Sequence, residues 1–156
     1  MGDELLGKIG TFIVRRLARY EIILIAIVLL PVAAWYYKVP GFEVISYAIL
    51  TLTGVIYFFS AFGDVSDLSN SGFDIVVYKS VAIATSIVLE GILYRIKQYP
   101  LAGNFIIISG GALALGLILI LYRLINDPDN KIFHKFLVVR IIVFCIIAAM
   151  MLFYSH

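Results

Sequence analysis

The chain has few of the residues from which most active sites and metal centres are built. Its 156 residues include two histidines and a single cysteine, Cys145, and only 14% are charged. One cysteine excludes a disulfide within the chain and a cysteine metal cluster. His134 and His156 lie outside the apolar runs, so a bis-histidine haem held by this chain alone is not expected. The net charge of +2 is too small to indicate a nucleic-acid partner.

The sequence also lacks the motifs of common enzymes. It has no glycine-rich loop with a lysine for nucleotide phosphates, and the Gly110-Gly111 pair lies inside an apolar run instead. The acidic segment from Gly63 to Asp74 is typical of a solvated connector. We therefore expect no enzymatic activity, no cofactor and no metal site.

Apolar residues are what the chain has in excess. They make up 63% of the sequence, whereas a soluble domain has roughly 45–50%. They form five runs, at about 22–37, 44–62, 75–94, 105–125 and 136–154. Helices of about 20 residues match the ~30 Å hydrocarbon thickness of a bilayer. The composition predicts one all-α integral membrane domain, residues 1–156, with five transmembrane helices.

Residues 4–20 differ from these runs because they contain both apolar and basic residues, each recurring at helical spacing. Arg15, Arg16 and Arg19 lie mostly on the side opposite to the apolar positions. One interpretation is an amphipathic helix in the headgroup region of the membrane. The other is an extension of the first transmembrane helix, since no helix-breaking residue separates the two segments.

Basic and aromatic residues predict how the helices are oriented. Trp35 and Lys38 belong to an interfacial belt before the turn at Pro40. If the N-terminus is cytoplasmic, nine Lys and Arg residues lie inside and three lie outside. This excess predicts a cytoplasmic N-terminus and an external C-terminus. In this arrangement Arg140 is one turn inside the fifth run, where its long side chain is able to extend to the interface.

Small residues on the apolar runs predict close helix packing. The second run is the most polar, and a packing face is favoured there over a permeation path. The predicted packing residues are Thr53, Gly54, Ala82, Ser86, Gly110, Ala112, Ala114 and Gly116.

Glu90 is the carboxylate that the sequence places deepest in a transmembrane helix. It lies ~8 Å below the external end of the third run, at 1.5 Å per residue. Ionisable residues inside a membrane often have a function, such as proton or ion binding. The alternative is a structural hydrogen bond or ion pair with Arg95 or Lys97, near Tyr94 on the same face. Both interpretations remain open at this point.

The two external turns are similar. Trp35-Tyr-Tyr-Lys-Val-Pro40-Gly41 and Tyr94-Arg-Ile-Lys-Gln-Tyr-Pro100-Leu-Ala-Gly103 each place aromatic and basic residues before a proline, and the prolines are 60 residues apart. This similarity raises the hypothesis of two tandem helical hairpins.

Two short patches resemble a known family. The turn at 94–103 and the segment Val55-Ile-Tyr-Phe-Phe-Ser60-Ala-Phe62-Gly are similar to parts of the GldL family of gliding-motility and type 9 secretion membrane proteins. The resemblance implies a bacterial inner-membrane protein with external hairpin tips. Thr53 stands where the family has its membrane-embedded glutamate, Gln98 stands where it has a histidine, and its long cytoplasmic tail is absent. Motor activity is therefore not inferred.

Two functions are consistent with these features. The first is a structural or accessory subunit that packs against another membrane protein or a second copy of itself. The second is a small transporter or proton-linked channel that uses Glu90. The short loops and the small-residue faces favour the first.

Overall fold

Five α-helices make up most of the part of the chain that the structure describes. The computed structural model describes residues 2–66, 71–128, 133 and 135–154, and all regular secondary structure in this part of the chain is helical. The helices are α1 (Gly2–Tyr36), α2 (Glu43–Ser60), α3 (Gly72–Ile96), α4 (Ala102–Asn126) and α5 (Lys135–Phe153). Each is long and apolar enough to cross a membrane. The all-helical prediction is confirmed. The bounds of α2 to α5 differ from the predicted runs by a few residues, whereas α1 begins at Gly2 and includes residues 4–20.

Parts of two predicted connectors, 67–70 and 129–132, fall outside the described residues, as do His134 and His156. Asp74 requires a correction, because it was assigned to the solvated connector. It lies in the first turn of α3 and is fully buried.

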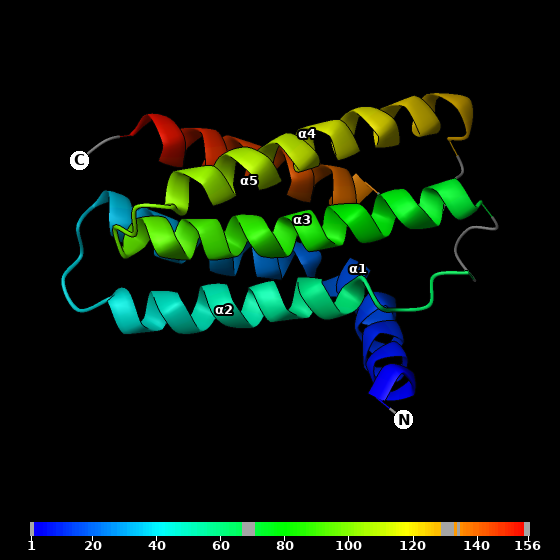
Figure 1. Ribbon diagram of the computed structural model, residues 1–156, viewed down its shortest axis with the longest axis horizontal. Helices are drawn as coiled ribbons and strands as arrows, with labels where there is room; N and C mark the ends of the chain where they lie inside the picture. Colours follow the sequence, from blue (N-terminus) through cyan, green and yellow to red (C-terminus); the bar gives the residue numbers. More distant parts are fainter. Residues whose placement is uncertain (1, 67–70, 129–132, 134, 155–156) are drawn as a thin grey trace.

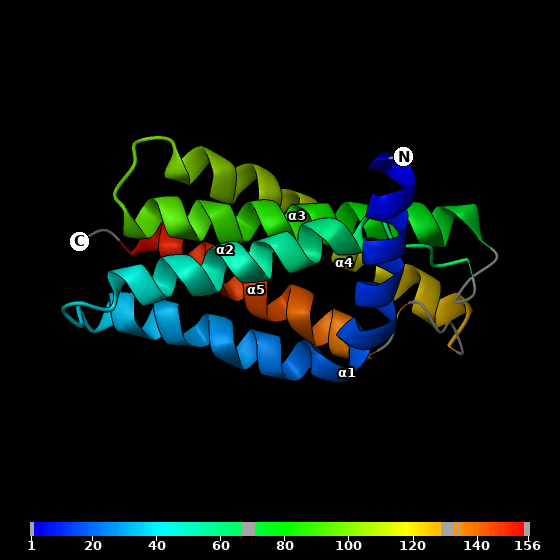
Figure 2. The same ribbon diagram turned by 90° about the horizontal axis from the view of Figure 1, so that it is seen from below.

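The helices form a bundle in which α3 is the most buried member. It packs against α2, α4 and α5, while α1 contacts α2 and α5 (Figures 1 and 2). The α1–α2 and α3–α4 turns lie at one end of the bundle, which is also where the chain ends after α5 (Figure 1). The N-terminus lies towards the opposite end, with the α2–α3 connection. Five passes along the bundle therefore place the two chain ends far apart.

Large apolar side chains fill the interior of the bundle. Every helix contributes fully buried apolar side chains, and the one from α1 is Val28. This continuous cluster includes Leu50, Leu89, Ile92, Ile106, Leu113, Ile120, Leu137 and Phe144.

Helix α1 combines features of both interpretations of residues 4–20. It is a single helix that continues through Pro31 to Tyr36, as the extension hypothesis requires. Its N-terminal part nevertheless runs at a steep angle to the bundle (Figures 1 and 2). At Gly10 this part crosses the end of α2 at backbone contact distance: a Cβ added to Gly63 would lie 2.7 Å from the carbonyl oxygen of Gly10. Glycine at both positions allows this crossing.

A hydrogen bond adds to the glycine contact. The backbone N–H of Asp64 donates to the hydroxyl of Thr11 at 2.8 Å, which joins α1 to the loop after α2. The Asp64 carboxylate in turn accepts the backbone N–H of Ser66 at 2.9 Å. That hydrogen bond favours the ionised carboxylate and lowers the pKa of Asp64 below its usual value.

The α1–α2 and α3–α4 turns have the same hydrogen-bond pattern. In the first turn, the N–H of Lys38 donates to the carbonyl of Trp35, and the N–H of Val39 donates to the carbonyl of Ala34. In the second turn, the N–H groups of residues 98 and 99 donate in the same way to the carbonyls of residues 95 and 94. Helices α1 and α3 thus both end in a Schellman motif. Its left-handed residue is Lys38 (φ 52°) in one turn and Gln98 (φ 58°) in the other, so the 60-residue spacing extends to backbone geometry.

Candidate functional site

A buried ion pair joins the first and last helices. The Nη1 atom of Arg140 on α5 donates to Oε1 of Glu21 on α1 at 2.6 Å, and both residues have no exposed surface. Charges removed from water require such a partner, because an unpaired buried charge costs several kcal/mol. The pair therefore fixes the relative position of two helices that are 119 residues apart in the sequence.

Two tyrosines surround the ion pair. The guanidinium carbon of Arg140 lies 4.5 Å from the ring centre of Tyr57, a cation–π arrangement. The Tyr57 ring in turn meets Phe144 edge-on, with ring centres 6.1 Å apart. Tyr78 on α3 is also buried and lies close enough to interact electrostatically with the pair. The cluster of Glu21, Arg140, Tyr57 and Tyr78 therefore links four helices: α1, α2, α3 and α5.

The buried position of Arg140 differs from the interfacial one that the sequence allows, and Glu21 is not among the predicted site residues. Arg140 is fully buried and donates to Glu21, which lies one residue before the predicted start of the first run. Glu90 is accordingly not the only carboxylate within the apolar helices. A usable signal was present, since Glu21 and Arg140 have opposite charges and lie near the same end of the first and fifth runs.

A second ion pair joins the two helices of the α3–α4 hairpin. Asp74 at the start of α3 accepts two hydrogen bonds from Arg123 near the end of α4, at 2.7 Å from Nε and 3.0 Å from Nη2. This bidentate geometry is the strongest form of an Arg–carboxylate interaction. Each residue also has the charge that stabilises its helix end. The pair therefore holds together the end of the hairpin away from its turn.

Glu90 lies at the seam between α2 and α3. A Cβ added to Gly54 would lie 3.6 Å from Oε1 of Glu90 and 3.7 Å from Oγ of Ser86, so the carboxylate rests beside the backbone of α2. Its side chain is partly exposed, and it follows Ile83 and Ile87 in an exposed stripe along α3. No salt bridge is found for Glu90 among the described residues.

The basic residues predicted to pair with Glu90 have other partners. Arg95 Nη2 donates to the carbonyl oxygen of Tyr154 at 3.3 Å, beyond the end of α5. The Lys97 ammonium lies 4.1 Å from the ring centre of Tyr47. Tyr94 packs in an aromatic cluster against Tyr99 and Phe105. Arg95 and Lys97 therefore contact other groups in this structure, and the ion pair with Glu90 that one interpretation requires is not found among the described residues.

Most of the predicted packing residues are used inside the bundle. Thr53, Gly54, Ala82 and Ser86 are buried between α2 and α3 or in the core. On α4, a Cβ added to Gly116 would lie 2.5 Å from a Val81 methyl, and one at Gly110 would lie 3.5 Å from Ala148. Ala112 and Ala114 face outwards.

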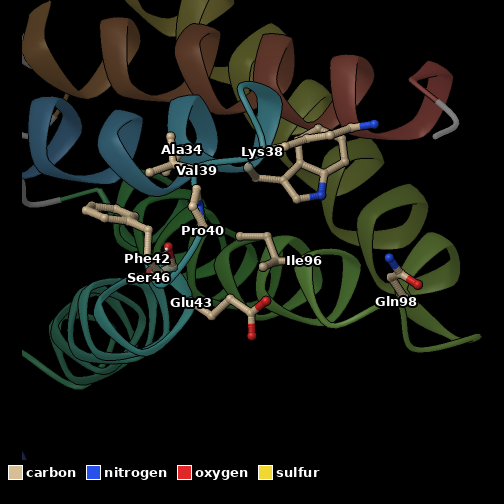
Figure 3. A pocket seen from close by; sticks show the side chains of 10 residues that line it. Ala34, Lys38, Val39, Pro40, Phe42, Glu43, Ser46, Ile96 and Gln98 are labelled. Carbon is tan, nitrogen blue, oxygen red and sulfur yellow. Dashed lines mark hydrogen bonds between the residues drawn. The ribbon is translucent and has the colours of Figure 1, made fainter.

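The predicted interface residues lie at the two ends of the bundle. Arg15, Arg16 and Arg19 are exposed on α1, while Lys38 is exposed at the α1–α2 turn. Trp35 meets Tyr154 edge-on, with ring centres 5.9 Å apart. A cavity of about 380 Å³ opens between the α1–α2 turn and the α3–α4 turn, and its lining includes Trp35, Lys38, Glu43 and Gln98 (Figure 3). No group of three or more potential metal ligands occurs in the described part of the chain.

Five helices of membrane-spanning length and hydropathy indicate a multi-pass membrane protein. No known family model matches the chain, and no curated protein or solved structure is significantly similar to it. The resemblance to the GldL family therefore stays a prediction from two sequence patches.

Proposed function

We propose that this protein is a structural or accessory subunit of a membrane complex, and that a partner transmembrane helix binds along the α2–α3 seam at Glu90. The observation that carries the proposal is a partly exposed carboxylate on an apolar helix face. The nearby basic residues of this chain, Arg95 and Lys97, contact other groups.

The energetics favour a partner with a basic side chain. A carboxylate in the hydrocarbon region is costly unless it is protonated or paired with another group. Ile83 and Ile87 on the same face of α3 are exposed, so a second helix can pack along this stripe and reach the carboxylate. A lysine or arginine on that helix would neutralise Glu90 at this seam.

A transporter or proton-linked channel is the second candidate, because an unpaired carboxylate can also bind a proton or a cation. The centre of the bundle offers little support for it. Leu50, Leu89, Ile92 and Leu113 have no exposed surface and fill the space between the helices. Transport would therefore have to follow the outer seam, where Glu90 is accessible.

Site-specific cross-linking tests the accessory-subunit proposal. A photo-reactive phenylalanine derivative at Ile87, one turn from Glu90, should cross-link in native membranes to a helix that contains Lys or Arg. Ile118 on α4 is also exposed and serves as the control position. The Ile87 adduct should decrease severalfold in the Glu90→Gln background and persist in Glu90→Asp. Equal adducts from both positions, or an Ile87 adduct insensitive to Glu90→Gln, would contradict the proposal.

The transport candidate has its own readout. Proton or cation flux in proteoliposomes that contain only this protein should depend on Glu90 if the chain is a transporter. Flux that is unchanged by Glu90→Gln excludes that role.

We further infer a bacterial plasma-membrane location, with the N-terminus cytoplasmic and the C-terminus external. The excess of basic residues towards the N-terminal end of the bundle supports this orientation. In this arrangement residues 4–20 lie along the cytoplasmic interface, which their steep angle to the bundle supports. The repeated turn geometry at residues 38 and 98 supports a tandem pair of hairpins.

A further inference from the structure

The N-terminal part of α1 has three chemically distinct faces. Gly10, Val14 and Leu17 are buried against the bundle. A second face is apolar and exposed, with Leu5 61% and Phe12 58% accessible. The third face is basic. It carries Lys8, Arg15 and Arg19 at helical spacing, all exposed.

Three faces are what a helix needs at the junction of protein, hydrocarbon and water. A helix buried in the bilayer would not place several cations on one side, and a helix in water would not expose large apolar residues on another. The buried face is fixed by the glycine contact between Gly10 and Gly63 and by the hydrogen bond from Asp64 to Thr11. The apolar and basic faces are therefore presented at fixed angles rather than by a flexible tail.

Arg16 extends the basic face across the apolar one. Its guanidinium carbon lies 4.4 Å from the ring centre of Phe12, so the arginine covers an apolar ring while its charge stays accessible. A shallow depression of about 630 Å³ lies along this part of the helix, and Glu4, Lys8, Thr11, Arg15 and Arg16 contribute to its lining. Lys8 donates to the Glu4 carboxylate at 2.6 Å, so the two arginines supply the net positive charge of this lining. Guanidinium donors beside an exposed aromatic ring match a phosphate group attached to an acyl chain.

We propose that residues 4–19 of α1 bind the headgroups of anionic phospholipids in the leaflet on this side of the membrane. The phosphate groups contact Arg15, Arg16 and Arg19, and the adjoining acyl chains cover Leu5, Ile9 and Phe12. The inference rests on the proposed interfacial position of this segment, and it is independent of a partner helix at Glu90. Each basic residue near an anionic membrane contributes about 1 kcal/mol, which corresponds to about fivefold in affinity.

Lipid retention by the full-length protein tests this proposal. The protein is purified from nanodiscs that contain phosphatidylcholine with or without phosphatidylglycerol, and the lipids that remain bound are measured by native mass spectrometry. The wild type should retain phosphatidylglycerol in preference to phosphatidylcholine. The triple variant R15Q/R16Q/R19Q should lose at least about tenfold of that preference. The triple variant R15K/R16K/R19K keeps the charge and should retain most of it.

A matched control removes three charges at the other end of the bundle. The variant K38Q/R95Q/K97Q should retain phosphatidylglycerol as the wild type does. Equal loss in this control would show a net-charge effect and would overturn the proposal, as would unchanged retention in R15Q/R16Q/R19Q. Inorganic phosphate that displaces the lipid at equal concentration would identify a free phosphate site instead. If the glutamine triple variant does not fold, the single variants should each lose about threefold to fivefold, and no loss in any of them would overturn the proposal.

A depth measurement separates this inference from the interfacial position on which it rests. A nitroxide at Leu5→Cys, in a Cys145→Ser background, should report contact with acyl chains. A water-exposed nitroxide together with preserved lipid retention would contradict the interfacial position alone. A nitroxide in contact with acyl chains, together with no preference for phosphatidylglycerol, would contradict the headgroup site alone.

Discussion

Arg140 is the largest fully buried side chain in the described part of the protein, and it has a single carboxylate to balance its charge. Its Nε and Nη2 atoms have no hydrogen-bond partner among the described residues. The cation–π contact with Tyr57 compensates for part of this deficit. The ion pair with Glu21 is therefore costly to break from either side, although it need not stabilise the fold relative to a well-packed apolar pair.

Substitutions of this ion pair should be strongly non-additive. Glu21→Leu or Arg140→Met alone should lower the free energy of unfolding by about 3–5 kcal/mol, because each leaves an unpaired buried charge. The double variant E21L/R140M should recover most of that loss. Unfolding in mixed micelles with increasing denaturing detergent measures all three variants. A double variant that is as unstable as the sum of the single variants would contradict the pairing.

The left-handed residues Lys38 and Gln98 give a second prediction at this scale. A residue with a Cβ is disfavoured at positive φ by about 1–2 kcal/mol, whereas glycine is not. Gln98→Gly should therefore raise the midpoint of thermal unfolding, with a gain of about 1 kcal/mol after the added flexibility of the unfolded chain is included. Gln98→Ala keeps the Cβ and serves as the control. A decrease with glycine would contradict the turn geometry.

Among the helices, α1 is the one whose two parts have different surroundings. Its part after residue 19 belongs to the apolar bundle, while its first part crosses α2 at Gly10 and Gly63. The crossing depends on two residues without side chains, so it can be disrupted without changing the bundle.

Gly10→Val should detach the N-terminal part of α1 from α2. Limited trypsin digestion should then cut at Arg15, Arg16 or Arg19 at least severalfold faster, with little change in the thermal unfolding of the bundle. Gly7→Val is the matched control, because a Cβ at Gly7 meets nothing within 4 Å. Equal digestion rates for the two variants would show that the crossing does not hold the segment.

The sequence predicts the helices well and their polar contacts poorly, for physical reasons. Long apolar runs and the prolines in the two turns are local signals, and they locate α2 to α5 and the end of α1 within a few residues. The pairs Glu21–Arg140 and Asp74–Arg123 join residues 119 and 49 positions apart, so no local pattern identifies them. The sequence identifies Glu90 as a candidate because it is a carboxylate within an apolar run. Whether Glu90 has an ionic partner depends on the directions of the Arg95 and Lys97 side chains, which no local pattern predicts.

At the scale of the whole molecule, the two ion pairs act on different connections. Asp74–Arg123 closes the α3–α4 hairpin, and Glu21–Arg140 joins α1 to α5. One ion pair thus connects two helices that follow each other in sequence, and the other connects the first helix to the last. This arrangement leaves the α2–α3 seam with Glu90 and the basic face of α1 as outward-facing polar features.

In the proposed topology the chain crosses a membrane five times, with its ends on opposite sides. Single cysteines at Glu4 and at Phe153, both exposed, can be introduced in a Cys145→Ser background. They are treated with a membrane-impermeant maleimide in intact bacterial cells. We expect Phe153→Cys to be labelled in intact cells and Glu4→Cys only after lysis. Labelling of both cysteines from the same side would contradict the account.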